Sequence, residues 1–222
     1  GEMTTWIAVA AVAGAAAVVA WWWLHRVDAL GRRRSVPWVG LGALLVVGLV
    51  SGLLALRHGA LERKLSGVAS QLAGSSVRVH CESYAGSFVD AEVEPGYVRF
   101  GPDGRPERAT TVKADQCRHL ASYIASSKKQ PSEAQILAVH LLTHEAMHMA
   151  GIADEARAEC AAVQRDARSA RLLGASAGEA AALAHSYWAS YYPRMPDDYR
   201  APGCAPGSSL DEGLDDPPWP RR

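Results

Sequence analysis

Residues 132–160 read SEAQILAVHLLTHEAMHMAGIADEARAEC, and this stretch decides how the C-terminal part of the chain folds. Ser132, with Gln135 three residues later, has the pattern of a capping box and predicts the start of a helix. Gly151 predicts the end of that helix, because glycine commonly follows the last helical turn. Apolar residues lie on both faces between these two signals, so the sequence predicts a helix buried in the middle of its domain.

Three side chains of this helix form a pattern with chemical meaning. His144 and His148 are four residues apart, so their imidazoles project from the same face and can bind one metal ion. Glu145 lies about 100° around the helix from His144, where its carboxylate can reach a water molecule without binding the metal. The pattern predicts Zn²⁺ as the cofactor, with Glu145 as the catalytic proton acceptor beside it.

Residues 144–148, HEAMH, resemble the active-site helix of the zincin metallopeptidases, which reads HExxH. Residues 154–160, DEARAEC, look like the NExxSD or NExxAD segment of the gluzincins, a group within the zincins. This resemblance implies that Glu155 is the third zinc ligand and that Glu159 hydrogen-bonds His144 without touching the metal. The roles are physically sensible, because a metal-binding imidazole needs an acceptor for its other nitrogen.

One departure from the gluzincin pattern is the short connection between the two helices. Gluzincins separate these helices by many more residues than 149–154. The two helices of this chain must therefore form a tight hairpin through Gly151.

A second resemblance gives another choice of third ligand. The segment from His144 to Asp154 also matches HExxHxxGxxD, the form of the metzincin motif in which aspartate is the third ligand. Asp154 is equally suited to cap the next helix. We favour Glu155, because that choice also gives Glu159 a role. Both resemblances cover only residues 143–160.

Two uncharged apolar runs precede the domain, at residues 6–24 and 36–56. At about 1.5 Å per residue, each is long enough to cross a hydrocarbon core of about 30 Å. Residues 1–57 are therefore predicted to be a two-span transmembrane anchor in contact with the lipid bilayer. The alternatives are a cleaved signal peptide for the first run, which lacks a basic start, and a buried core hairpin for both.

Basic residues predict the orientation of the two spans. The connection between the runs contains four arginines against one aspartate: Arg26, Arg32, Arg33, Arg34 and Asp28. The positive-inside rule places this connection in the cytoplasm and both termini outside. Basic residues at 57, 63 and 64, after the second run, weaken the signal. We expect a multi-pass protein of the cell membrane with an extracytoplasmic C-terminal domain.

The cysteines agree with this placement. All of them lie beyond the apolar runs and none forms a CxxC pair: Cys81, Cys117, Cys160 and Cys204. An even number at wide spacing predicts two disulfides in an oxidising compartment. Three pairings are possible, and we favour Cys81–Cys117 and Cys160–Cys204 because each closes one contiguous region. Four reduced thiols in a cytosolic domain are the alternative.

The predicted fold class is α+β, with two transmembrane helices followed by a mainly helical zincin-like domain with a small antiparallel sheet. The expected divisions after the anchor are a juxtamembrane helix and linker (58–76), the domain (77–192) and an extended, partly disordered Pro/Gly/Asp-rich tail (193–222). Within the domain we expect strands at 77–80, 87–93 and 97–100 and helices at 114–126, 154–173 and 176–192.

Composition and motif together favour a membrane-anchored zinc metallopeptidase acting on a peptide or protein substrate. The 23 Lys and Arg residues balance the 23 Asp and Glu residues and are scattered, which argues against a nucleic-acid partner. The alternative is a catalytically inactive zinc-binding ectodomain that acts as a membrane assembly or sensing module. His140 is predicted to be a hydrogen-bonded core histidine. Five further side chains are predicted to be packing residues, although they include possible donors to an oxyanion: His185, Tyr187, Tyr191, Tyr192 and Tyr199.

Overall fold

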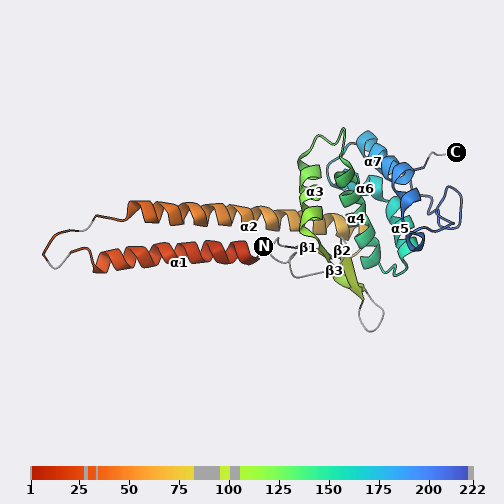
Figure 1. Cartoon of the computed structure of the whole chain (residues 1–222). Helices are drawn as coiled ribbons and strands as arrows, with labels where there is room; N and C mark the ends of the chain where they lie inside the picture. Colours follow the sequence, from red (N-terminus) through yellow and green to blue (C-terminus); the bar gives the residue numbers. More distant parts are fainter. Residues whose placement is uncertain (1, 28–29, 34, 83–95, 101–105, 220–222) are drawn as a thin grey trace. The chain divides into compact units, whose positions relative to one another are not determined.

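The computed structural model describes residues 2–27, 30–33, 35–82, 96–100 and 106–219. The chain divides into two compact units, Gly1–Ala60 and Leu61–Arg222, and the boundary falls within a long helix, α2. In chain order the elements are α1 (Glu2–Leu24), α2 (Trp38–Ala73), β1 (Arg78–Cys81), β2 (Gly96–Phe100), β3 (Pro106–Val112), α3 (Ala114–Ala125), α4 (Glu133–Met149), α5 (Glu155–Val163), α6 (Asp166–Leu172), α7 (Ala177–Ser190), η1 (Tyr192–Arg194) and η2 (Asp197–Tyr199) (Figure 1).

The first unit contains α1 and the beginning of α2. Both helices are long and apolar enough to cross a membrane, which confirms the prediction of two long apolar helices. Many of their large apolar side chains are exposed: Leu24, Val39 and Leu49 are 78%, 89% and 75% exposed. Such a continuous apolar surface is rare on proteins that face water on all sides.

The end of α2 belongs to the second unit. Leu65, Val68 and Leu72 are buried in the core of that unit. The hydroxyl of Ser66 accepts a hydrogen bond from the backbone N–H of Val79, at 2.9 Å, and so fastens the helix to β1. Residues 61–73, which the sequence predicted to be a juxtamembrane helix and linker, are therefore part of the folded domain.

The sheet differs from the predicted antiparallel one. Its strand order is β1-β3-β2, in which β2 pairs with β3 antiparallel but β1 pairs with β3 parallel. The direction in which β1 joins the sheet depends on its pairing with β3, which is distant from it in sequence. The run 106–112 was not predicted as a strand, and the predicted strand at 87–93 lies outside the described residues.

Helix α4 is the central helix of the domain, between α3 on one side and α5 to α7 on the other (Figure 1). Every residue from 142 to 149 is buried. Its start is the predicted capping box of Ser132 and Gln135. Its end is a Schellman motif, in which the N–H of Ile152 donates to the carbonyl of Met147 and Gly151 adopts φ +107°.

The predicted helix at 154–173 is two helices, α5 and α6. Gln164 ends α5, and its buried side chain donates to the carbonyls of Cys160 and Leu210. The new direction after this break brings Asp166, the first residue of α6, to the side of α4. The helices predicted at 114–126 and 176–192 correspond to α3 and α7, and α7 begins with a capping box of Ser176 and Glu179.

Both favoured disulfides are confirmed: Cys81–Cys117 and Cys160–Cys204. The second one fastens the 193–222 segment to α5. Further contacts of this segment are the ion pairs of Arg165 with Glu212 and of Arg171 with Asp216. The segment is irregular, as its composition indicates, but these bonds attach it to the domain.

Candidate metal centre

The hairpin of α4 and α5 brings three side chains to one point. The Nε2 atoms of His144 and His148 lie 2.9 Å apart, and each lies 3.2 Å from Oε2 of Glu155. The short connection needed for this geometry is provided by the Schellman motif at the end of α4 and by Asp154, whose side chain caps α5. The ligand atoms of these three residues form one group that could hold a metal ion.

The other ring nitrogen of each histidine is held by an acceptor. Nδ1 of His144 lies 3.0 Å from Oε2 of Glu159, and Nδ1 of His148 lies 2.8 Å from the carbonyl oxygen of Ile152. Each Nδ1 must therefore carry the proton, because neither acceptor can donate one. In the neutral imidazoles this leaves both Nε2 atoms as lone pairs that face each other and the carboxylate of Glu155.

Three lone pairs at such short range repel one another unless a cation lies between them. Tetrahedral zinc with bonds of about 2.0–2.1 Å holds its ligand atoms about 3.3 Å apart, close to the spacing found here. Two imidazoles and one carboxylate are also a ligand set of catalytic zinc. The side chain of Glu155 is 42% exposed while those of His144 and His148 are 9% and 6% exposed, so the group is open to solvent on the side of Glu155.

A second group that could hold a metal ion lies deeper and shares His144: His140, His144 and Glu159. Nε2 of His140 is 2.9 Å from Oε2 of Glu159, and its Nδ1 is 2.9 Å from Oδ2 of Asp166. All of these side chains are buried. His140 is thus the hydrogen-bonded core histidine that the sequence predicted, in a network of carboxylates.

The pKa values of the two groups reflect their partners in the absence of metal. Burial lowers the pKa of His144, but hydrogen bonds to Glu155 and Glu159 outweigh it and raise the pKa to about 9. Burial also lowers the pKa of His140, while the charges of Asp166 and Glu159 raise it to about 10. Burial raises the pKa of Glu159, but the cationic histidines hold it well below its ordinary value. The carboxylates around His140 and His144 therefore favour positive charge at these two side chains.

The carboxylate of Glu145 contacts the sheet. Glu145 is 3% exposed, and the hydroxyl of Thr110 on β3 donates a hydrogen bond to its Oε2 at 3.0 Å. This hydrogen bond fixes the orientation of the Glu145 side chain. Strand β3 thus holds the side chain of Glu145, the residue that follows His144 in the sequence.

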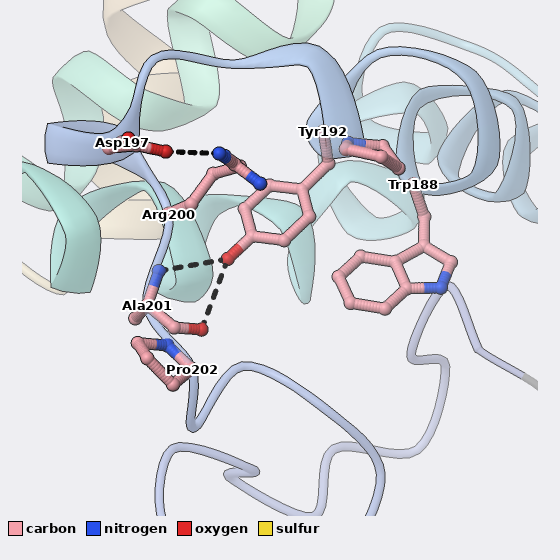
Figure 2. Close-up of a pocket in the computed structure, with 7 residues that line it drawn as sticks. Trp188, Tyr192, Asp197, Arg200, Ala201 and Pro202 are labelled. Atoms are coloured by element: carbon pink, nitrogen blue, oxygen red, sulfur yellow. Dashed lines mark hydrogen bonds and ion pairs between the residues drawn. The ribbon is translucent and has the colours of Figure 1, made fainter.

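A loop from the tail covers another side of the centre. The ring of Tyr199, in η2, lies 5.9 Å from the ring of His144. The hydroxyl of Tyr192 bonds to both the N–H and the carbonyl of Ala201, and Arg200 pairs with Asp197, so the loop is fixed at both ends (Figure 2).

This loop also forms one wall of a pocket of about 530 Å³. Aromatic residues, prolines and the Asp197–Arg200 pair line it: Trp188, Tyr192, Pro193, Asp197, Arg200, Ala201 and Pro202 (Figure 2). Residues adjacent in sequence face the pocket and the histidines in turn. Tyr187 contacts His140 and Tyr199 contacts His144, whereas the next residues along the chain, Trp188 and Arg200, line the pocket. The 3-10 helix η2 therefore borders both the pocket, through Asp197, and the ligand His144, through Tyr199, whereas α7 borders the pocket and the deeper group.

The structure joins most, but not all, of the side chains that the sequence selected. His144, His148 and Glu155 meet, Glu159 contacts His144, and Asp154 is a helix cap outside both groups. Thr110 from β3 and Asp166 from α6 also reach the site, and neither was predicted from the sequence. The residues around Thr110 and Asp166 give no indication of these contacts, because each side chain reaches the site only when a distant element folds against α4.

No protein family, curated protein or solved structure matches this chain. The likeness to zincins is therefore confined to the motif, and the geometry of the described residues carries the functional argument.

Proposed function

We propose that the chain is a membrane-anchored zinc metallopeptidase that hydrolyses peptide bonds outside the cytoplasm. The observation that carries this proposal is the meeting of three ligand atoms, from His144, His148 and Glu155, at 2.9 to 3.2 Å from one another, close to the spacing of a tetrahedral zinc site. The side chain of Glu155 is partly exposed, so a substrate could reach the metal from that side. Two long apolar helices and two disulfides support a membrane protein whose domain folds in an oxidising compartment.

Each residue of the centre has a part in this function. His144, His148 and Glu155 hold the ion, and the hydrogen bonds to their outer atoms keep them oriented. When bound, zinc supplies a Lewis acid that polarises a carbonyl oxygen and lowers the pKa of a water molecule toward neutrality. Glu145 takes the proton of the attacking water and passes it to the leaving amine. The hydrogen bond from Thr110 keeps the carboxylate of Glu145 in one orientation.

The pocket beside η2 supports a peptide as the substrate. Its aromatic and proline walls suit an apolar side chain, and the Asp197–Arg200 pair at its edge offers polar contacts to a peptide backbone. Because η2 borders both this pocket and His144, the pocket can hold a substrate side chain while a neighbouring bond reacts.

The full-length protein in detergent micelles provides the test, through its zinc content and its cleavage of a library of quenched fluorescent peptides. We expect about one zinc ion per chain and measurable cleavage. Glu145→Gln should retain zinc but lower turnover at least about a hundredfold, because it removes the general base. Glu133→Gln is the matched control, since Glu133 is an exposed residue of the same helix.

The possible results separate the two functions considered. A Glu145→Gln variant that binds zinc and cleaves peptides at the wild-type rate would contradict the assignment of the base. A wild-type protein that binds zinc but cleaves no peptide would instead support the alternative, an inactive zinc-binding ectodomain for membrane assembly or sensing. A folded wild-type protein without zinc would exclude both.

A further inference from the structure

Glu159 is the centre of a buried network that lies behind the metal centre. Its Oε2 faces Nε2 of His140 at 2.9 Å and Nδ1 of His144 at 3.0 Å. Its Oε1 accepts a hydrogen bond of 2.6 Å from the hydroxyl of Tyr187. Glu159 is only 1% exposed, so these protein groups replace water around both of its oxygens.

His140 supplies the positive charge of this network. Both of its ring nitrogens lie 2.9 Å from carboxylate oxygens, one of Glu159 and one of Asp166. An imidazole that donates to a carboxylate on each side is an imidazolium. The ring of Tyr187 stacks on that of His140, with centroids 3.5 Å apart and planes 11° from parallel. This stacking fixes the plane of the cation, and the cation in turn offsets the buried carboxylates.

The same contacts make a second metal ion at this depth unfavourable. A metal at the group of His140, His144 and Glu159 would need the lone pairs of His140 Nε2 and His144 Nδ1. Both nitrogens instead point at one oxygen of Glu159, at distances suited to N–H donors. The single carboxylate oxygen can accept both hydrogen bonds, so protons alone satisfy the group.

We propose that His140 and Tyr187 are positioning residues for the metal centre. They hold Glu159 in one orientation, and Glu159 in turn holds the proton of His144 on Nδ1 and leaves its Nε2 for the metal. Asp166 accepts a hydrogen bond from the other ring nitrogen of His140, Nδ1. This inference rests on the proposed zinc site, and it adds two residues to that site which touch neither metal nor substrate.

Tyr187→Phe tests the proposal with the smallest change. The variant keeps the ring that stacks on His140 and removes only the hydroxyl that bonds to Glu159. We expect the zinc affinity of the full-length protein, measured by competition with a fluorescent chelator, to fall about tenfold. The absorption spectrum of the Co²⁺-substituted protein should also change, because it reports the geometry around the metal. Tyr191→Phe is the matched control: it is the same substitution at the residue that caps the end of α7.

His140→Gln tests the cationic member of the network. The glutamine amide can still donate to Glu159 but lacks the charge and the second donor toward Asp166. We expect a loss of zinc affinity greater than that of Tyr187→Phe. Should this variant fail to fold, as judged by circular dichroism, the Tyr187→Phe result decides the proposal alone.

Three results would overturn the inference. Wild-type zinc affinity and an unchanged Co²⁺ spectrum in folded Tyr187→Phe would show that the network does not position His144. About two zinc ions per wild-type chain, reduced to about one by His140→Gln, would make His140 a ligand. A wild-type protein that binds no zinc would overturn the proposed function and this inference with it, whereas the first two results leave the peptidase proposal intact.

Discussion

Two tyrosines of the domain are almost wholly buried, and their hydroxyl groups are in opposite situations. Tyr187 is 1% exposed and its hydroxyl bonds to Glu159, whereas Tyr123 is 0% exposed and its hydroxyl has no hydrogen-bond partner among the described residues. A buried polar group without a partner lowers stability, because it loses its hydrogen bonds to water. The same loss of a hydroxyl should therefore have opposite effects at the two positions.

Tyr123→Phe is expected to make the protein about 1 kcal/mol more stable at neutral pH. The contact of the ring with Lys128, whose Nζ lies 5.9 Å from the ring centroid, is retained by phenylalanine. The free energy of unfolding, measured by urea denaturation at constant zinc concentration, gives the comparison. A variant less stable than the wild type would show that the hydroxyl has a favourable partner.

The advantage of Tyr123→Phe should grow at alkaline pH. Burial, and in second place the charge of Glu179, raises the pKa of Tyr123 from 10.0 to about 12 in the folded chain. Between these pH values the unfolded chain loses the phenol proton while the folded chain keeps it, so the wild type loses stability as the pH rises. The variant has no such proton and lacks this contribution. Equal pH dependence of the two proteins from pH 9 to 11 would contradict the pKa shift.

At the scale of elements, the two disulfides differ in what they fasten. Cys160–Cys204 attaches the loop of η2 to α5, directly beside Glu159, and closes a sequence separation of 44 residues. Cys81–Cys117 attaches β1 to α3 and closes a separation of 36 residues. The effect of a crosslink on the unfolded chain depends on loop length, so the two bonds should stabilise the domain by similar amounts, about 4 kcal/mol each.

Replacement of each disulfide by two serines should separate stability from metal binding. We expect both Cys160→Ser/Cys204→Ser and Cys81→Ser/Cys117→Ser to lower the free energy of unfolding by comparable amounts. Only the first should also weaken zinc binding, because it frees α5, which carries Glu155 and Glu159. Chelator competition at a temperature where both variants remain folded measures this difference. Equal zinc affinities in the two variants would show that the tail does not support the centre.

The elements that the sequence predicted well are those with local signals. The starts of α4 and α7 follow from capping boxes within four residues, and the end of α4 follows from Gly151. The pair of histidines follows from helical spacing in the same way. These features need no knowledge of the rest of the chain.

The elements that the sequence predicted poorly depend on distant partners. The break between α5 and α6 is stabilised by the bond from Gln164 to Leu210, which lies 46 residues further along the chain. The parallel pairing of β1 depends on β3, and β3 begins with Pro106 and lacks a clear alternation of apolar residues. Asp166 and Thr110 reach the histidines only after these elements are in place. Local patterns therefore revealed the ligands but not the groups that hold them.

At the scale of the whole molecule, the open question is the side of the membrane on which each unit lies. The basic connection between the two apolar helices favours a cytoplasmic position for that connection. The two disulfides of the domain favour an oxidising compartment on the opposite side. These arguments are independent, since one uses the charges of the loop and the other the chemistry of the domain, and both predict an extracytoplasmic metal centre.

Cysteine labelling in intact cells can test this topology with little background, because all four native cysteines are in disulfides. Ser208→Cys places a thiol on an exposed part of the domain, and Ser35→Cys places one on the exposed connection between the helices. We expect a membrane-impermeant maleimide to label Ser208→Cys in intact cells and Ser35→Cys only after the membrane is opened. The reverse pattern would place the domain in the cytoplasm. There its disulfides would face a reducing environment, and a peptidase at this centre would act on cytosolic substrates.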